Sequence, residues 1–307
     1  MRVLITGITG FVGRRFARHL LAHHEHEIVG LATDLETWDL EEIEVECVDV
    51  TDREALGEVI ARRDPEAIVH FAGLSHVGES WQRPGDYLRV NFGGTRNLVH
   101  AAAGRRVLFA SSAEVYGKVP ADEQPIREGR PVDPRSPYAM TKACAEEIAL
   151  DRGAVIVRSF NAIGPGQSLQ FALPSFAHQL AAIQRGEHEP VIHVGDLSPE
   201  RDFLHIEDAV RGYATLLESA EAGTVYNLAS GQSHSIADVL DRLRAISGVD
   251  AEVRRDEARV RVVDMPLMCG DVSRLRGLGW SPRFTAEDAL ADLWRAAISD
   301  PVDATAG

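Results

Sequence analysis

The sequence predicts an α/β protein, with a Rossmann-type doubly wound parallel sheet and a smaller mixed α/β C-terminal lobe. Two observations predict the sheet. Short β-branched runs alternate with helix-length amphipathic stretches through the first half of the chain, which is typical of βαβ units. A glycine-rich turn follows the first of these runs at once. Right-handed crossovers then lay the strands into one parallel sheet.

The pattern of apolar residues locates the individual elements. We expect strands at residues 3–6, 27–31, 45–48, 67–71, 107–110 and 154–157, and helices at 11–23, 52–63, 87–103 and 138–151. After about Asn161 the glycines and prolines of residues 164–174 break this rhythm, and further helices are expected at 172–185, 207–219, 236–247 and 286–298. We therefore assign residues 1–160 to the Rossmann part and 161–307 to the C-terminal lobe, which we expect to bind substrate, and the chain can cross between them.

Composition excludes several classes of protein. The 307 residues include 32 Lys and Arg against 47 Asp and Glu, so the formal net charge is 32 − 47 = −15. Such a chain would be repelled by nucleic acid and by anionic membrane surfaces. No apolar run approaches the roughly 20 residues of a spanning helix, and the N-terminus lacks the features of a signal peptide. Because Cys47, Cys144 and Cys269 are widely spaced, we expect reduced thiols in a cytoplasmic protein.

The turn after the first strand has the spacing of a dinucleotide-binding loop. Its sequence is GITGFVG, with Gly7, Gly10, Phe11, Val12 and Gly13 at the contact positions. The first two glycines allow a tight turn and close approach to a pyrophosphate, which then lies at a helix N-terminus, and the third allows close packing of helix and strand. Because the motif joins a predicted strand to a predicted helix, we expect it to bind NAD or NADP.

The choice between the two cofactors stays open. An acid at the end of the second strand would bind the ribose 2′-hydroxyl, but Asp34 lies one or two positions late, and Arg14 could reach a phosphate from the glycine loop. Asp49, followed by Val50 at the end of the third strand, could present a carboxylate to the adenine amino group. It could equally belong to the cap of the next helix.

A second group of residues has the character of a proton-transfer site. Tyr138 and Lys142 are spaced i and i+4, so they share one face of a helix, and a nearby ammonium would lower the pKa of the phenol toward neutrality. Ser112 and Glu114 follow the predicted strand at 107–110, where parallel strands present ligand sites. The Ser112 hydroxyl could donate to a developing oxyanion beside the tyrosine.

Several histidines are possible ligands. The run at residues 23–26, HHEH, resembles a metal cluster, but it falls where the first helix should end, and we interpret it as a surface loop. No metal site is predicted. His70 and His76 flank Ala72 and Gly73; we expect structural hydrogen bonds for His70 and leave His76 open between structure and ligand contact.

Taken together, these motifs resemble those of the extended short-chain dehydrogenases/reductases that act on nucleotide sugars. This group is also called the NAD-dependent epimerase/dehydratase family. The resemblance rests on GITGFVG, DVTD (49–52), HFAGLSHVGES (70–80), VNFGGT (90–95), SSAEVYG, SPYAMTK and RDFLHIED (201–208). Within the family, SFNAIGPGQSLQF (159–171), HVGDLSPERDF (193–203) and ARVRVVDMP (258–266) are most similar to GDP-4-keto-6-deoxymannose reductases, which form GDP-rhamnose.

The resemblance implies a reaction and a set of residues. Hydride would pass from the nicotinamide to a 4-keto carbon while Tyr138 protonates the oxygen, with Ser112 and Lys142 completing the catalytic set. Implied cofactor contacts are Gly7, Gly10, Gly13, Asp49, Val50, Ala72, Gly73, Tyr138 and Lys142. Implied substrate contacts are Ser112, Glu114, Asn161, Arg201 and Arg261. Fixed guanidinium groups suit a nucleotide diphosphate in an otherwise acidic protein, although either arginine could instead form a surface ion pair.

Departures from the family pattern keep alternatives open. Related dehydratases use the residue matching Glu114 to remove a sugar proton, but many place an acid or hydroxyl where this chain has Ala113, and an alanine cannot donate a proton. Related reductases often have histidine at the position of Ala162. The alternatives are a nucleotide-sugar 4-epimerase, a 4,6-dehydratase and a non-catalytic dinucleotide sensor. Many relatives form homodimers through a four-helix bundle, which here would use residues 91–103 and 138–150.

Overall fold

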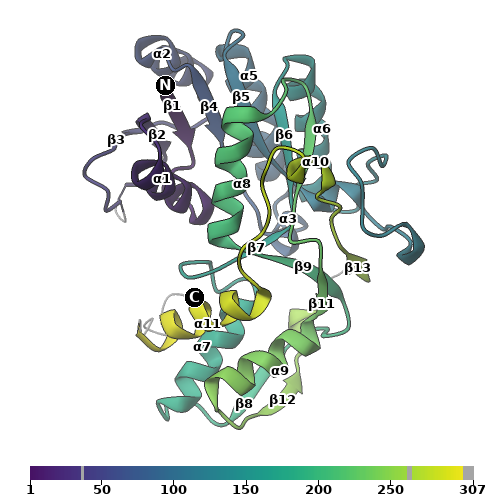
Figure 1. Cartoon of the computed structure of the whole chain (residues 1–307). Helices are drawn as coiled ribbons and strands as arrows, with labels where there is room; N and C mark the ends of the chain where they lie inside the picture. The colour runs from purple at the N-terminus through teal and green to yellow at the C-terminus, as the bar shows by residue number, and fades with distance from the viewer. Residues whose placement is uncertain (36–37, 261–264, 300–307) are drawn as a thin grey trace.

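The computed structural model describes residues 1–35, 38–260 and 265–299. Its centre is a seven-stranded sheet in the order β10-β6-β5-β4-β1-β2-β3, in which every neighbouring pair is parallel (Figure 1). The strands are β1 (Arg2–Thr6), β2 (Glu27–Ala32), β3 (Glu44–Cys47), β4 (Ala67–His70), β5 (Arg106–Ser112), β6 (Val155–Ser159) and β10 (Val225–Leu228). The predicted Rossmann-type sheet is therefore confirmed.

The strand order reverses between β1 and β4, which pair with each other while their successors run outward to opposite edges. In open parallel sheets the crevice at the carboxyl ends of such strands is the usual ligand site. The seventh strand, β10, was not predicted from the sequence. It comes from beyond residue 160 and completes the edge of the sheet by pairing with β6.

Helices cover both faces of this sheet. One face is covered by α1 (Phe11–His23) and α8 (Ile206–Ser219), and the other by α2 (Arg53–Arg63), α5 (Thr95–Ala101) and α6 (Pro137–Asp151) (Figure 1). Successive strand residues point to opposite faces, so Val3 and Ile5 join the core beneath α1 and α8, whereas Leu4 joins the core beneath α2 and α5. Burial on both sides explains why these strands are continuous apolar runs.

The predicted helix at 87–103 is not a uniform α-helix. Its first part, η1 (Leu88–Gly94), is a π-helix that continues into α5. A Cβ at Gly94 would lie 2.6 Å from Val50 Cγ2, so the backbone here approaches the loop after β3 very closely. Short helices precede it at α3 (Val77–Ser80) and α4 (Pro84–Tyr87).

The C-terminal lobe packs three helices against short strands. The helices are α7 (Ala172–Gln184), α9 (Ile236–Ser247) and α11 (Ala286–Ser299), and they share an apolar core of their own. A four-stranded sheet contains β7 (Asn161–Ile163), β9 (Glu200–His205), β11 (Ser233–Ser235) and β13 (Leu267–Met268), and β8 (Val191–Val194) pairs with β12 (Glu252–Arg255). The remaining short elements are η2 (Ala113–Tyr116), η3 (Ala121–Glu123), η4 (Glu257–Arg259) and α10 (Ser273–Arg276).

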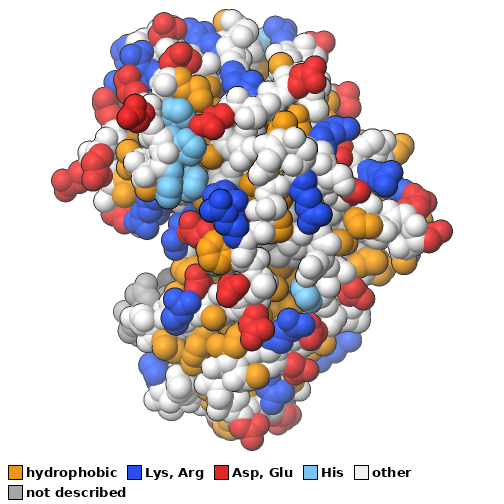
Figure 2. All heavy atoms as spheres, viewed as in Figure 1, with side chains coloured by type: hydrophobic (Ala, Val, Ile, Leu, Met, Phe, Trp, Pro, Cys, Tyr) orange, Lys and Arg blue, Asp and Glu red, His pale blue; other side chains and the backbone are white. Residues whose placement is uncertain are grey.

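The charged surface, the helices and the cysteines can be compared with what the composition predicted. Acidic and basic side chains are interspersed over the face shown in Figure 2. Within the described ranges, no helix has both the length and the apolar character needed to cross a bilayer. The three cysteines, all of them described, form no disulfide.

Candidate active site

The glycine loop forms a cradle with an open helix end. Gly7 has a φ of +66°, and a Cβ there would lie 2.7 Å from the backbone nitrogen of Ala72. A Cβ at Gly13 would lie 2.2 Å from the Gly7 carbonyl oxygen. Helix α1 begins after Gly10 with no side-chain cap and no acid in its first turn, so its N-terminal N–H groups remain available to an anion. This loop fits a dinucleotide pyrophosphate, with the partly buried Phe11 and Val12 opening the helix.

Replacing Gly13 by alanine is expected to weaken NAD(P)H binding at least about tenfold, because the new methyl group would collide with the Gly7 carbonyl. Fluorescence titration of NADPH and NADH measures the effect. Gly57→Ala is the matched control: a Cβ there meets no atom within 4 Å, and alanine is favoured over glycine inside helix α2. Unchanged affinity in the Gly13 variant, with the control also unchanged, would contradict the assignment of this loop.

The cradle continues across the switch point to helix α6. The backbone N–H of Ala72 donates to Thr6 Oγ1 at 3.2 Å, which fixes the turn after β4 beside the end of β1. A Cβ at Gly73 would lie 3.5 Å from Lys142 Nζ. The structure thus places Gly7 next to Ala72 and Gly73 next to Lys142, four residues that the sequence analysis assigned to the cofactor site.

The positions of Asp34 and Arg14, the residues proposed to contact the adenosine ribose of the cofactor, do not distinguish NAD from NADP. Asp34 lies two residues beyond the end of β2 and is exposed. The Arg14 guanidinium lies 3.8 Å from the carboxylate of Asp39, so it takes part in an ion pair next to the glycine loop. These positions leave the choice between NAD and NADP open.

Asp49 does not cap helix α2. That role belongs to Asp52, whose carboxylate accepts the backbone N–H groups of Glu54 and Ala55. Asp49 instead accepts the N–H of Thr51 at 2.8 Å, and its side chain remains exposed at the carboxyl end of the sheet. The side chain of Val50, beside it, is buried against Gly94.

Tyr138 and Lys142 lie where the sequence predicted, on the first turns of α6. The helix begins at Ser136, whose hydroxyl accepts the N–H of Ala139 at 3.1 Å, and proline at the first position suits the helix start. The Tyr138 side chain is only 7% exposed. Burial raises its pKa to about 12; a hydrogen bond with Ser112 acts in the opposite direction, and the charge of Glu114 adds to the rise.

This finding corrects one expectation from the sequence. Lys142 was expected to lower the pKa of Tyr138, but its ammonium group donates to the Ala110 carbonyl at 2.8 Å and lies 4.9 Å above the ring of Phe109. Burial lowers the pKa of Lys142 to about 8, and the nearby Glu146 acts in the opposite direction. Tyr138 is therefore a neutral phenol at pH 7, which is the form that donates a proton.

Ser112 and Glu114 come from the end of β5 and the short helix η2. Ser112 Oγ accepts the N–H of Glu114 at 3.2 Å and so begins that helix. Glu114 is half-buried and close enough to Tyr138 for its charge to raise the phenol pKa. Ala113 between them is buried, and its methyl group packs in the apolar core.

A buried ionic network beneath the site was missed by sequence reasoning. Glu146 lies one turn after Lys142 and accepts two hydrogen bonds from Arg158 Nε and one from Arg158 Nη2, at 2.7–3.1 Å. Ser111 donates to the same carboxylate, and the Arg158 guanidinium lies over the ring of Tyr116. Spacing on α6 alone could suggest that Glu146 shares a face with Lys142, but no local pattern links it to Arg158 on β6.

The two histidines near the cofactor loop differ in role. His70 is fully buried, with Nδ1 2.7 Å from Thr6 Oγ1 and Nε2 3.0 Å from Thr95 Oγ1, so the structural interpretation is confirmed. His76 begins α3 by accepting the N–H of Glu79, and its ring lies 5.8 Å from that of Phe171 at the wall of a cavity.

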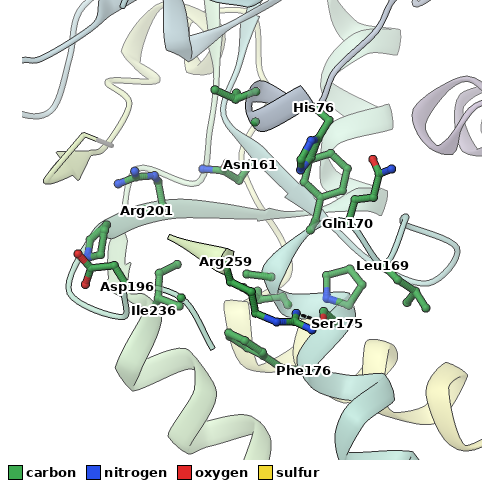
Figure 3. Close-up of a pocket in the computed structure, with 18 of the residues that line it drawn as sticks. His76, Asn161, Leu169, Gln170, Ser175, Phe176, Asp196, Arg201, Ile236 and Arg259 are labelled. Carbon is green, nitrogen blue, oxygen red and sulfur yellow. Dashed lines mark hydrogen bonds between the residues drawn. The ribbon is translucent and has the colours of Figure 1, made fainter. Parts of the chain in front are cut away.

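That cavity, of about 680 Å³, lies between the segment around α3 and the C-terminal lobe (Figure 3). Helix α3, whose residues line the cavity, packs against α6, the helix that holds Tyr138. Asn161 and Arg201, two of the substrate contacts that the family resemblance implies, line the cavity. Arg201 is fixed by donating to the carbonyls of Glu200 and Met265 at 2.7 and 2.6 Å. Arg261 lies outside the described residues.

Arg259 is a cavity residue that sequence reasoning missed. It reaches in from η4, with Nη1 3.4 Å from Ser175 Oγ and Nε 3.4 Å from Asp256 (Figure 3). The signal was present in the run ARVRVVDMP, which contains two arginines, of which only the second was selected.

Comparisons with known proteins find relatives that match nearly the whole chain. A relative from Pseudomonas aeruginosa named GDP-6-deoxy-D-mannose reductase is 34% identical over 97% of this chain and 96% of its own length. The solved structure of RMD from Pseudomonas aeruginosa complexed with NADPH superposes with a TM-score of 0.86 at 32% identity, covering 97% of this chain and 99% of that one.

Another solved structure, the UDP-glucose 4-epimerase of Thermus thermophilus in complex with NAD, has the same TM-score at 27% identity and the same coverage. The family model described as GDP-mannose 4,6 dehydratase matches residues 4–293. Solved neighbours thus bind NADPH in one case and NAD in another, which confirms the cofactor class and leaves the preference open. The chain belongs to the GDP-mannose 4,6 dehydratase family of NAD(P)-dependent extended short-chain dehydrogenases/reductases.

Proposed function

We propose that this protein reduces the 4-keto group of a nucleotide-linked 6-deoxyhexose, converting GDP-4-keto-6-deoxy-D-mannose to GDP-D-rhamnose with NADPH or NADH. The observation that carries the reaction class is the buried, protonated Tyr138, hydrogen-bonded to Ser112 one helical turn from Lys142. Full-length similarity to a GDP-6-deoxy-D-mannose reductase supports the substrate.

Each catalytic residue has a role that follows from its environment. NAD(P)H, when bound, supplies the hydride. Tyr138 donates its phenolic proton to the carbonyl oxygen, so the ketone becomes an alcohol, and the proton is replaced from solvent. Ser112 donates a hydrogen bond to the same oxygen as negative charge develops. Lys142, held by the Ala110 carbonyl with its ammonium group beside Gly73, would place its positive charge against the bound dinucleotide.

The local structure favours a reductase over a dehydratase. Many related dehydratases place an acid or hydroxyl at the position after Ser112, and the buried methyl group of Ala113 cannot donate a proton to a leaving hydroxide. Glu114 remains next to Tyr138, and we propose that it contacts the sugar. Asn161 and Arg201 in the adjoining cavity are the proposed contacts of the nucleotide diphosphate.

The direct test is a spectrophotometric assay. Purified protein supplied with GDP-4-keto-6-deoxy-D-mannose should oxidise NADPH or NADH and release one product, identified by NMR. No turnover with either cofactor would overturn the proposal. The same protein incubated with NAD and either GDP-mannose or UDP-glucose, without reduced cofactor, should leave both sugars unchanged.

Each alternative predicts a different result in that second incubation. An epimerase would convert UDP-glucose to its C4 epimer, as the name of the Thermus thermophilus neighbour implies for that protein. A dehydratase would form a keto sugar from GDP-mannose. A dinucleotide sensor would bind NAD(P)H and turn over none of these compounds.

Replacing Arg259 by methionine is expected to raise KM for the nucleotide sugar about tenfold or more, because a guanidinium group contributes charge-assisted hydrogen bonds to a diphosphate, while kcat changes little. Steady-state kinetics separates the two parameters. Arg255→Met is the matched control, since Arg255 is an exposed arginine paired with Glu257 outside the cavity lining. A fall in kcat at unchanged KM would argue against a binding role for Arg259.

We also propose that two copies of the chain pair through residues 91–103 and 138–150. Support comes from Leu88 and Met140, two large apolar side chains that are more than half exposed although their helices, η1 and α6, pack side by side. Light scattering at micromolar concentration should give the mass of a dimer, and Met140→Lys should shift it toward the monomer. A monomeric wild-type protein would contradict the pairing.

Two broader assignments remain proposals. We propose that residues 1–160 supply the dinucleotide site and residues 161–307 most of the substrate cavity, with α8 and β10 crossing back to the first sheet. We also propose a cytoplasmic location, which the three unpaired cysteines support.

A further inference from the structure

A cluster of histidines lies where α1 ends and approaches the last turn of α8. Figure 2 shows histidine side chains gathered in a column on this face. The rings of His24 and His26 stack at a centroid distance of 5.4 Å, and the ring of His19 lies 5.6 Å from that of His24. Glu218 completes the group: its Oε1 is 2.8 Å from His24 Nδ1 and 3.7 Å from His26 Nε2.

The local backbone explains why these side chains converge. Helix α1 ends at His23, and His24 has an extended conformation, with φ −138° and ψ 142°. In an extended chain, residues two apart point to the same side, so His24 and His26 face inward while Glu25 is exposed. Glu218 approaches from α8, which packs along α1. Because it lies so far along the sequence, the surface-loop interpretation of residues 23–26 could not include it.

His26 is the observation that points to a missing partner. Its side chain is only 11% exposed, yet neither ring nitrogen has a hydrogen-bond partner among the described residues. Buried polar groups in native proteins are nearly always satisfied, and an exception calls for a bound water or ion. The nearest ligand-type atoms of His24, His26 and Glu218 all lie within 4.8 Å of one another.

We propose that His24, His26 and Glu218 bind one divalent transition-metal ion of the zinc type. Two imidazole nitrogens and a carboxylate oxygen suit Zn²⁺, and three protein ligands leave a position for water. Ligands of a tetrahedral zinc ion lie about 3.4 Å apart, so small side-chain rotations bring the three groups into range. A metal in this position also gives His26 the partner that it lacks.

The neighbouring His19 is a neutral imidazole. Burial, together with the neighbouring His23, His24 and Arg211, lowers the pKa of His19 to about 4. His19, whose ring stacks on that of His23 at 4.5 Å, therefore adds no positive charge that would repel a cation near neutral pH.

The proposed ion would join two segments of the chain and take no part in ketone reduction. It would tie the α1–β2 connection to the end of α8, across the helix pair that covers one face of the sheet. Helix α1 has 13 residues, so the cluster lies about 20 Å from the glycine loop at its other end. We expect the ion to stabilise the folded chain without entering catalysis.

The experiment is a titration of tag-free protein, stripped with a chelator, with Zn²⁺ by calorimetry and with Co²⁺ by visible absorption. One ion should bind per chain. His24→Ala/His26→Ala should weaken binding about a hundredfold and Glu218→Gln about tenfold, while His188→Ala, which changes an exposed histidine elsewhere, should leave it unchanged. Zn²⁺ at a hundred times Kd should raise the Tm of the wild type by about 4 °C and that of the double variant not at all.

Two results would overturn the inference: no Zn²⁺ binding by the wild type, or binding that survives the double substitution, which would place the ion elsewhere. Tm values of the metal-free variants show whether the substitutions leave the fold intact. If the double variant does not fold, Glu218→Gln still tests the site, because it keeps the side-chain volume. Ketone reduction, assayed in the same samples, should not depend on Zn²⁺, so failure of the metal site and failure of the proposed activity are distinguishable.

Discussion

Replacing Tyr138 by phenylalanine is expected to lower kcat for ketone reduction by about two to four orders of magnitude. The substitution removes the phenolic proton while keeping the buried aromatic ring. Because burial holds the pKa of Tyr138 near 12, the wild-type residue is fully protonated at the start of each turnover, and no other group in the described site is assigned to deliver that proton. KM should change little, since the cavity residues remain in place.

Stopped-flow measurement of NADPH oxidation separates the chemical step from product release. Tyr226→Phe is the matched control, because Tyr226 lies on β10 at the far edge of the sheet and loses only its hydroxyl group. If Tyr138→Phe retained more than a tenth of the wild-type rate, Tyr138 would not be the proton donor. Loss of NADPH binding in the variant would instead indicate a disturbed fold.

Replacing Glu146 by glutamine is expected to destabilise the fold by about 3–5 kcal/mol, because it leaves the Arg158 guanidinium buried without its counter-charge. The two side chains are 2% and 7% exposed, and their contact links α6 to β6. For a chain of this length the corresponding fall in Tm is about 5–8 °C. Thermal unfolding measures it, and Glu147→Gln, at the neighbouring exposed position, should change Tm by less than about 1 °C.

A double variant distinguishes loss of charge balance from loss of packing. Glu146→Met with Arg158→Met removes both charges, so it should be more stable than Glu146→Gln alone. The single variant should also lower the pKa of Lys142 further, since Glu146 opposes the effect of burial on that ammonium. Its kcat should therefore decline at a lower pH than that of the wild type. If Glu146→Gln were as stable as the wild type, the Glu146–Arg158 pair would contribute nothing to the stability of the fold.

The amphipathic patterns predicted most of the fold, because alternation and helical periodicity are local properties. The predicted strands and helices of the Rossmann part occur with ends shifted by a few residues. β10 escaped prediction because Val225–Leu228 follows α8 as an ordinary short apolar run, and nothing local shows that it pairs with β6. The π-helix at Leu88–Gly94 escaped because apolar periodicity does not distinguish a short π-helical stretch from the α-helix that continues it.

The candidate site was predictable where its residues belong to compact motifs. Spacing alone placed Tyr138 and Lys142 on one helical face and the glycines at a helix start. It could not give the degree of burial, so the direction of the Tyr138 pKa shift was wrong. Nor could it reveal Arg259 in the cavity, because that depends on how η4 returns beside Ser175. Long-range packing determined each of these outcomes.

The return of α8 and β10 to the first sheet has a consequence for biosynthesis. When only residues 1–160 have left the ribosome, β6 lacks β10, its partner at the edge of the sheet. The Phe16 side chain on α1 also lacks its contact with Tyr213 of α8. Such a nascent chain exposes both an apolar surface and an unpaired strand, which are the features that promote aggregation. The dinucleotide-binding layer is therefore completed only after residue 228 emerges, and the cofactor cannot stabilise its finished form any earlier.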